Sequence, residues 1–186
     1  MSVWGNVSVY TAGQLFATPN SGLMPIVIVS IFFLDLWMGI MVALARKKYN
    51  IQYPTLYAVA GTTRYSPPSK TETEAISSSP LTTDKTKDII SEEDAYAFNC
   101  VQRGHQNTLE KIPVVVAMLL ITWHSFPLPA AICGFVWIAG RVLYMLGYTI
   151  SPAWRNVGFI FYFGLFSLIG LTLATAGFFY QKTGAY

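Results

Sequence analysis

Three polar side chains recur at helical spacing in one stretch of the chain. Arg103, Asn107 and Glu110 stand at positions i, i+4 and i+7, so on an α-helix they fall within an arc of about 60°. Gln106 flanks this stripe. One helix face thus offers a cation, an amide and a carboxylate. That combination suits a zwitterionic ligand that carries both carboxylates and an amine.

A second group follows about thirty residues later, and it also falls on one helix face. Its members, Arg141, Tyr144 and Tyr148, are spaced i, i+3, i+7. Tyrosine hydroxyls can hydrogen-bond a ligand while the rings line a slot. The alternative for either tyrosine is an anchor at the membrane interface, which is an equally common role.

Arg155 comes shortly after this group and is a candidate for binding an anion. Ser151 is predicted as a helix N-cap with Pro152 in the first turn, which puts Arg155 in that turn as well. The free amides and the dipole at a helix N-terminus favour an anion, so a guanidinium there would suit a thiolate. Taken alone, Arg155 is more simply a charge that fixes membrane orientation.

The composition indicates that these residues lie in a membrane protein. Hydrophobic residues make up 53% of the 186 residues and charged residues only 11%, against about 25% charged in soluble domains. The net charge of +3 is too small to indicate nucleic acid. No Cys/His spacing predicts a metal site, and Cys100 and Cys133 are interpreted as packing residues.

Four segments are predicted to span the membrane, which makes the protein an all-α, single-domain, four-helix bundle. They cover residues 24–45, 98–123, 130–150 and 157–180, each near the roughly 20 residues that a spanning helix needs. Helices are the default in lipid because every backbone group must be satisfied internally. Asp35 in the first segment should face another helix or a pore, as a structural contact or as part of a site.

The second segment is the unusual one. Its apolar part, Ile112 to Trp123, is too short to span alone, so the helix must begin near Phe98 or Val101. It then carries the polar stripe, which is costly against lipid and should face protein or a wet cavity. Pro113 is predicted to kink it.

The distribution of Lys and Arg predicts the orientation. The segments that follow the first helix and the third helix carry basic residues, whereas the turn between helices two and three carries none. Both chain ends, 1–23 and 181–186, should therefore face the lumen, and the polar end of helix two the cytosol. Residues 61–94 read as a polar cytosolic loop. Asn6 begins a glycosylation sequon that matters only on a luminal end.

Three blocks of the chain resemble the microsomal glutathione transferases of the type-three branch, within the MAPEG family. The blocks are Ala45-Arg46-Lys47-Lys48-Tyr49-Asn50 with Tyr53-Pro54-Thr55-Leu56-Tyr57, then Phe98-Asn99-Cys100-Val101-Gln102-Arg103-Gly104-His105-Gln106-Asn107-Thr108-Leu109-Glu110, then Gly140-Arg141-Val142-Leu143-Tyr144 with Gly147-Tyr148. Two features depart from the family pattern. Lys111 stands where the leukotriene-conjugating branch has a tyrosine, and the 61–94 loop is longer than is usual.

The resemblance implies a homotrimer in the endoplasmic reticulum membrane or another organelle's outer membrane. Glutathione would be the co-substrate, bound between subunits near the cytosolic face, and lipophilic electrophiles or lipid hydroperoxides would arrive from the bilayer. By motif position, the implied glutathione contacts are Arg103, Asn107, Glu110, Tyr144 and Tyr148, with Arg46 and Arg141 as basic residues lining the same site and Arg155 activating the thiol.

This resemblance predicts a glutathione transferase with peroxidase activity and possible leukotriene-synthase-like activity. Two alternatives remain open from the sequence. One is a non-catalytic relative that presents lipid to a partner enzyme, and the other is an accessory subunit of a larger membrane complex.

Overall fold

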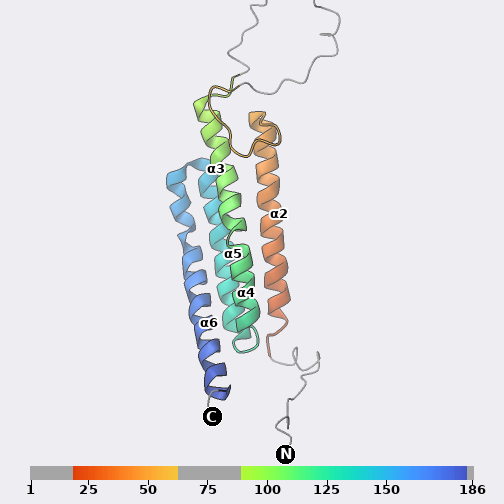
Figure 1. Ribbon diagram of the computed structural model, residues 1–186, viewed down its shortest axis with the longest axis vertical. Helices are drawn as coiled ribbons and strands as arrows, with labels where there is room; N and C mark the ends of the chain where they lie inside the picture. The colour runs from red at the N-terminus through yellow and green to blue at the C-terminus, as the bar shows by residue number, and fades with distance from the viewer. Residues whose placement is uncertain (1–18, 63–88, 184–186) are drawn as a thin grey trace, which may run out of the picture.

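The regular elements of the described chain are all helices (Figure 1). The computed structural model describes residues 19–62 and 89–183, so the sequon at Asn6 and most of the 61–94 loop lie outside the described residues. The elements are α2 (Leu23–Tyr49), α3 (Glu92–Leu109), α4 (Ile112–Thr122), α5 (Pro127–Ile150), the 3₁₀-helix η1 (Pro152–Phe159) and α6 (Ile160–Thr183).

The long elements run side by side and alternate in direction. α2 begins and α6 ends at the same end of the bundle, while η1 lies near the opposite end (Figure 1). α3 and α4 follow one another down the bundle, and α5 returns beside them. α2 packs against α3 and α5, and both η1 and α6 pack against α5. α5 is therefore the helix that brings the remaining elements together.

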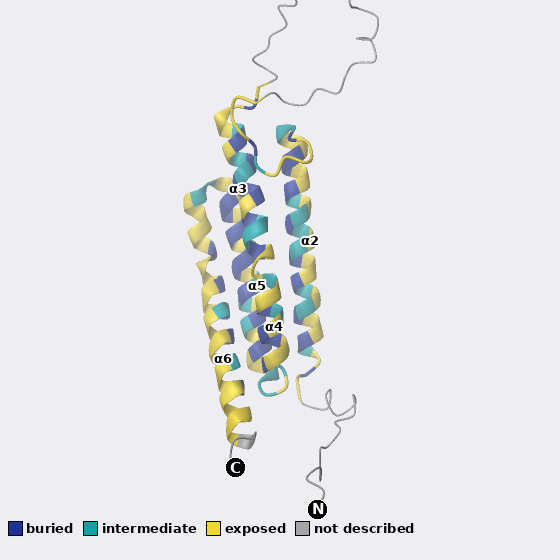
Figure 2. Cartoon of the chain, in the orientation of Figure 1, coloured by how far each residue is buried: buried dark blue, intermediate teal, exposed yellow. Residues whose placement is uncertain are grey.

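Within residues 19–62 and 89–183, three helices are long and apolar enough to cross a membrane: Leu23–Tyr49, Pro127–Ile150 and the continuous stretch Pro152–Gln181. α2 shows why lipid is their solvent. One stripe, with Met24, Val27 and Ile31 at its start, is buried against the bundle, whereas Phe32 and Phe33 are about 60% exposed. The outer face of α6 is exposed in the same way (Figure 2). Such apolar outer faces indicate a multi-pass membrane protein.

The chain between residues 92 and 122 forms two helices that meet at Glu110 and Lys111. Pro113 explains the break, because it has no N–H to donate to the carbonyl of Leu109 four residues earlier. At the break, the amide of Lys111 donates to the carbonyl of Thr108, three residues earlier, which is the tighter hydrogen-bond pattern of a 3₁₀ turn. The predicted kink at Pro113 is thus a full interruption between α3 and α4.

α3 begins at Glu92, earlier than the predicted start near Phe98. Ser91 explains the difference, because its side chain accepts a hydrogen bond from the amide of Asp94 at 3.0 Å. The first turn also carries three acidic residues, which the helix dipole favours at this end. The end of the predicted 61–94 loop is therefore the first turn of a helix.

Two glycines bring η1 into backbone contact with α5. A Cβ added at Gly147 of α5 would meet the carbonyl oxygen of Trp154, and one added at Gly158 of η1 would lie 2.5 Å from the Cα of Tyr144. No larger residue fits at either position without separating the two elements. This contact fixes where η1, and so Arg155, lies relative to the end of α5.

We expect Gly147→Ala to lower the midpoint of thermal unfolding in detergent by several degrees. The added methyl group pushes η1 away from α5, and overpacking of this kind costs about 1–3 kcal/mol. The matched control is Gly170→Ala in α6, where a Cβ meets nothing within 4 Å. That control should match the parent protein or exceed it slightly, since alanine is the better helix former. Equal midpoints for the two variants would contradict the close contact.

A polar cavity between α3, α5 and η1

A polar cavity of about 310 Å³ lies where α3, the end of α5 and η1 meet. Its lining combines three ionisable groups that can be charged at neutral pH with amides and phenols. The lining residues are Tyr57, Arg103, Gln106, Asn107, Glu110, Tyr144, Tyr148 and Arg155. The structure therefore brings together the helical stripe, the two tyrosines of α5 and the arginine after them.

The cavity holds two guanidinium groups and one carboxylate. Arg103 and Arg155 supply the positive charges and Glu110 the negative one. Over residues 19–62 and 89–183, no ion pair joins Glu110 to either arginine. The charged groups are thus left for a ligand rather than neutralised by one another. Such a site favours a ligand with an excess of negative charge and one cationic group.

Arg155 is held at the edge of the cavity by the end of α5. Its Nη1 donates a hydrogen bond of 3.3 Å to the hydroxyl of Tyr148, and its guanidinium carbon lies 5.9 Å from that ring's centre. Ser151 occupies the predicted N-cap position, but its side chain makes no cap hydrogen bond. Arg155 lies in the 3₁₀-helix η1, ahead of α6, and its side chain is exposed.

The tyrosines form the α5 side of the cavity. Tyr144 and Tyr148 are each 7% exposed, and their rings meet edge to face with centres 5.0 Å apart. The ring of Phe161 also packs edge to face against that of Tyr144, with the ring centres 5.6 Å apart. Because the rings pack on one another, each restricts the movement of the other at the cavity wall.

Arg141 lies beneath the cavity instead of lining it. It is 1% exposed, with its guanidinium carbon 3.9 Å from the ring centre of Phe161. Its Nη1 donates a 2.8 Å hydrogen bond to Oδ1 of Asn107. This bond occupies the carbonyl of Asn107, so the amide NH₂ group is the part left to meet a ligand. Arg141 therefore positions Asn107.

Arg46 also lies outside the lining of this cavity. Its guanidinium carbon stacks 4.3 Å from the ring centre of Tyr53 and 5.2 Å from that of Phe98. The side chain is 8% exposed. A direct contact of Arg46 with the ligand remains a prediction from the sequence resemblance.

Tyr57 is the lining residue that the helical spacings did not single out. It comes from the irregular segment after α2, where no periodicity predicts which side chains face inward. Its hydroxyl donates to Oε1 of Gln106 at 2.6 Å. The sequence carried one signal, since Tyr57 ends the first block that resembles the family, but that resemblance assigned no ligand contact to it.

The sequence profile of the MAPEG family matches residues 24–177, a range that includes most of the helical bundle and every residue lining the cavity. The chain belongs to the MAPEG family. This family includes glutathione transferases, peroxidases and leukotriene synthases, and its members use glutathione. The polar cavity of this MAPEG protein is thus a candidate glutathione site on geometry and on family membership.

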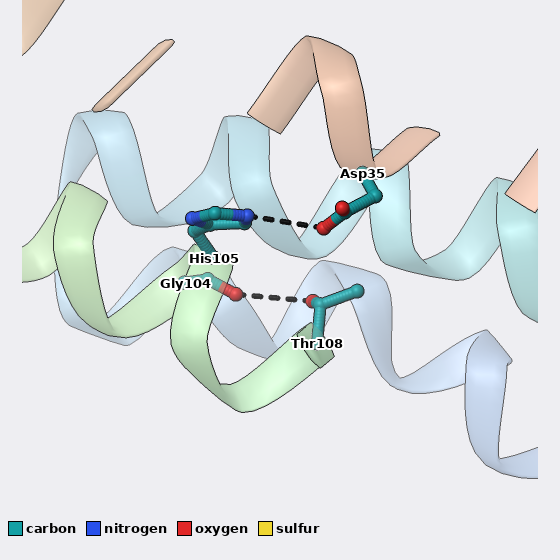
Figure 3. Close-up of polar contacts among 4 residues, drawn as sticks. All are labelled: Asp35, Gly104, His105 and Thr108. Atoms are coloured by element: carbon teal, nitrogen blue, oxygen red, sulfur yellow. Dashed lines mark hydrogen bonds and ion pairs between the residues drawn. The ribbon is translucent and has the colours of Figure 1, made fainter. Parts of the chain in front are cut away.

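A separate polar contact joins α2 to α3 (Figure 3). Nε2 of His105 lies 3.1 Å from Oδ1 of Asp35. On the same stretch of α3, the hydroxyl of Thr108 donates back to the carbonyl of Gly104 at 3.0 Å. Neither Asp35 nor His105 lines the polar cavity. Asp35 therefore faces another helix, as the sequence predicted, and acts here as a structural contact between the two helices.

We expect Asp35 and His105 to be energetically coupled. In a double-mutant cycle with alanine, their coupling free energy should be about 0.5–1.5 kcal/mol, the usual net worth of a hydrogen bond. The measurement is the free energy of unfolding in detergent micelles. Ser30→Ala is the control on α2, because the Ser30 hydroxyl bonds only within its own helix, to Ile26. Strictly additive losses would show that the contact contributes nothing to stability.

Proposed function

We propose that this MAPEG protein is a membrane-bound glutathione transferase and peroxidase of the type-three branch. It activates glutathione as a thiolate, then conjugates it to lipophilic electrophiles or uses it to reduce lipid hydroperoxides. The observation that carries the proposal is the charge pattern of the polar cavity. The guanidinium groups of Arg103 and Arg155 are positive, and the carboxylate of Glu110 is negative.

Glutathione has the complementary charges. At neutral pH its two carboxylates and one ammonium group mirror two guanidinium groups and one carboxylate. The cavity volume of about 310 Å³ is within the range of about 300–1,000 Å³ for small-molecule sites. The size and the charge of the cavity therefore both suit the tripeptide. The proposed binding requires no metal.

Each lining group then has a role. Arg103 binds a carboxylate of glutathione, a geometry that guanidinium favours, and Glu110 binds the ammonium group. Asn107, fixed from below by Arg141, donates its amide to the peptide. Tyr144 and Tyr148 orient the ligand with their hydroxyls. The sulfur lies toward Arg155, within η1.

The thiol is the group whose chemistry must change. A free thiol has a pKa of about 8.5 and is mostly protonated at neutral pH. A guanidinium beside the sulfur favours the charged form and lowers the pKa of the bound thiol. In conjugation the thiolate forms a carbon–sulfur bond to an electrophilic carbon, while a π bond or carbon–oxygen bond of that substrate breaks and its electron pair takes up a proton. In peroxide removal two molecules of glutathione give their disulfide, while the hydroperoxide becomes an alcohol and water.

The assembly and location belong to the same proposal. The broken pair α3–α4 is the fourth membrane crossing beside the three apolar spans, and three such subunits form a homotrimer.

Both chain ends face the lumen, and the polar cavity faces the cytosol, where glutathione is supplied. The membrane is that of the endoplasmic reticulum or of another organelle. Hydrophobic substrates approach through the exposed apolar faces of the bundle.

Arg155→Ala should lower turnover far more than it weakens glutathione binding. Without the guanidinium the pKa of the bound thiol rises by about 1–3 units, so turnover at pH 7 should fall about 10- to 100-fold. Because the thiol then ionises at higher pH, turnover of the variant should rise between about pH 7 and pH 9 toward that of the parent. Ultraviolet absorbance of the bound thiolate and kcat at several pH values measure this.

The control for Arg155→Ala is Lys47→Ala, which removes an exposed basic residue at the end of α2 outside the cavity. It should leave both the thiolate signal and turnover unchanged. Loss of glutathione binding by Arg155→Ala, with turnover of the bound complex intact, would overturn the role assigned to Arg155.

Asn107→Ala and Glu110→Ala should mainly weaken binding. A hydrogen bond to a charged group contributes about 1.5–3 kcal/mol, which corresponds to a roughly tenfold or greater rise in Kd for Glu110→Ala. The neutral amide of Asn107 should give a smaller rise. Calorimetric titration with glutathione measures both. If either variant kept the parent affinity, that residue of the α3 stripe would be structural.

A further inference from the structure

The segment 51–62, called the strap here, leads out of α2 and carries Tyr57 to the polar cavity. It is irregular, yet both of its ends are tied down. The amide of Ile51 donates to the carbonyl of Arg46 at 3.0 Å. At the other end, Gly61 and Thr62 exchange backbone hydrogen bonds with Ile90, at 3.0 and 2.9 Å. Between these ends, the backbone-to-backbone hydrogen bonds of the described strap residues run within the strap itself, as from the amide of Thr55 to the carbonyl of Gln52 at 3.1 Å.

Asn99 of α3 holds the middle of the strap. Its Nδ2 donates to the carbonyl of Ala58 at 2.9 Å, and its Oδ1 accepts from the amide of Ala58 at 2.8 Å. One side-chain amide thus satisfies both backbone groups of a residue that is 6% exposed. Only a carboxamide offers a donor and an acceptor in this arrangement at this reach.

The position of Asn99 in the sequence links it to the cavity. It precedes Arg103 by four residues, so it lies one turn earlier on the same face of α3. Ala58, which it binds, directly follows Tyr57. The Tyr57 hydroxyl in turn reaches Gln106, two turns along α3 from Asn99. The strap is therefore fixed to α3 on either side of Arg103.

Tyr57 also separates two spaces. Besides the polar cavity, it lines a neighbouring cavity of about 210 Å³ formed by the strap itself and Ile90. Tyr57 lines both cavities, so its displacement would widen the polar cavity on the strap side. A wall that excludes water strengthens the electrostatic contacts inside a site.

We propose that Asn99 is a positioning residue of the glutathione site, acting through Ala58 to hold Tyr57 as the wall on the strap side. The inference rests on the proposed function, because glutathione is the ligand that the wall confines. Asn99 itself touches neither the cavity nor Arg155. Its loss should therefore change affinity for glutathione more than the rate of the chemical step.

The test uses the full-length protein purified in detergent, titrated with glutathione, in four forms: parent, Asn99→Ala, Tyr57→Ala and the double variant. Asn99→Ala should raise Kd and KM for glutathione about fivefold, as expected for the loss of a pair of neutral hydrogen bonds, with kcat within about twofold of the parent. Tyr57→Ala should give a similar rise. The double variant should bind no more weakly than Tyr57→Ala alone.

Two further variants sharpen the result. Asn99→Asp keeps the acceptor for the Ala58 amide but loses the donor, so its affinity should fall between those of the parent and Asn99→Ala. Gln52→Ala is the control within the strap, since its side chain is exposed and, among the described residues, its hydrogen bond is to Asn50. Its affinity should equal that of the parent.

Hydrogen exchange separates the failure of this inference from that of the proposed function. The Ala58 amide should exchange faster in Asn99→Ala than in the parent, with or without glutathione. If the parent fails to bind glutathione, the proposed function is overturned, and the assigned role of Asn99 falls with it. If the parent binds but Asn99→Ala keeps its affinity, or its loss adds fully to that of Tyr57→Ala, only the inference about Asn99 is overturned.

Discussion

The structure depends on one constraint, which is that the polar face of α3 has to be kept away from hydrocarbon. A guanidinium, amides and a carboxylate follow one another along this helix, in a chain whose other long helices are almost wholly apolar. In lipid such groups are costly unless protein or water meets them. α5 and η1 meet them on one side, and the space left between these elements and α3 is the polar cavity.

Three polar side chains of α3 each bind a different element of the fold. Asn99 binds the strap through Ala58, and His105 contacts Asp35 of α2. Asn107 accepts from Arg141 of α5. These contacts leave α3 with little freedom to rotate, because turning it would break all of them at once. The side chains that remain unpaired in the cavity are consequently held by a helix fixed from three directions, which is the preorganisation that a binding site needs.

The place of Arg155 follows from backbone packing and not from any polar contact of its own. η1 lies directly on α5 because Gly147 and Gly158 carry no side chain where the two elements touch. The only hydrogen bond described for the Arg155 side chain, to Tyr148, is long at 3.3 Å. The arginine assigned to the thiolate is therefore exposed and lightly held, at the end of an otherwise rigid site. Such a group can adjust to the ligand without disturbing the fold.

The sequence by itself determined the membrane class, the helical architecture and which face of α3 is polar, because hydropathy and helical periodicity are local properties of the chain. Through spacing and motif it also pointed to six of the eight residues that line the cavity. Gln106 was noted only as a flanking residue, and Tyr57 was not singled out.

Tertiary structure decided the rest. Arg46 and Arg141 have long side chains whose direction depends on their neighbours. Arg46 stacks on Tyr53 and lines no part of the cavity, whereas Arg141 packs on Phe161 and reaches the lining only through Asn107. Tyr57 comes from an irregular segment that Asn99 binds across about forty residues of chain, a long-range contact that no local pattern encodes.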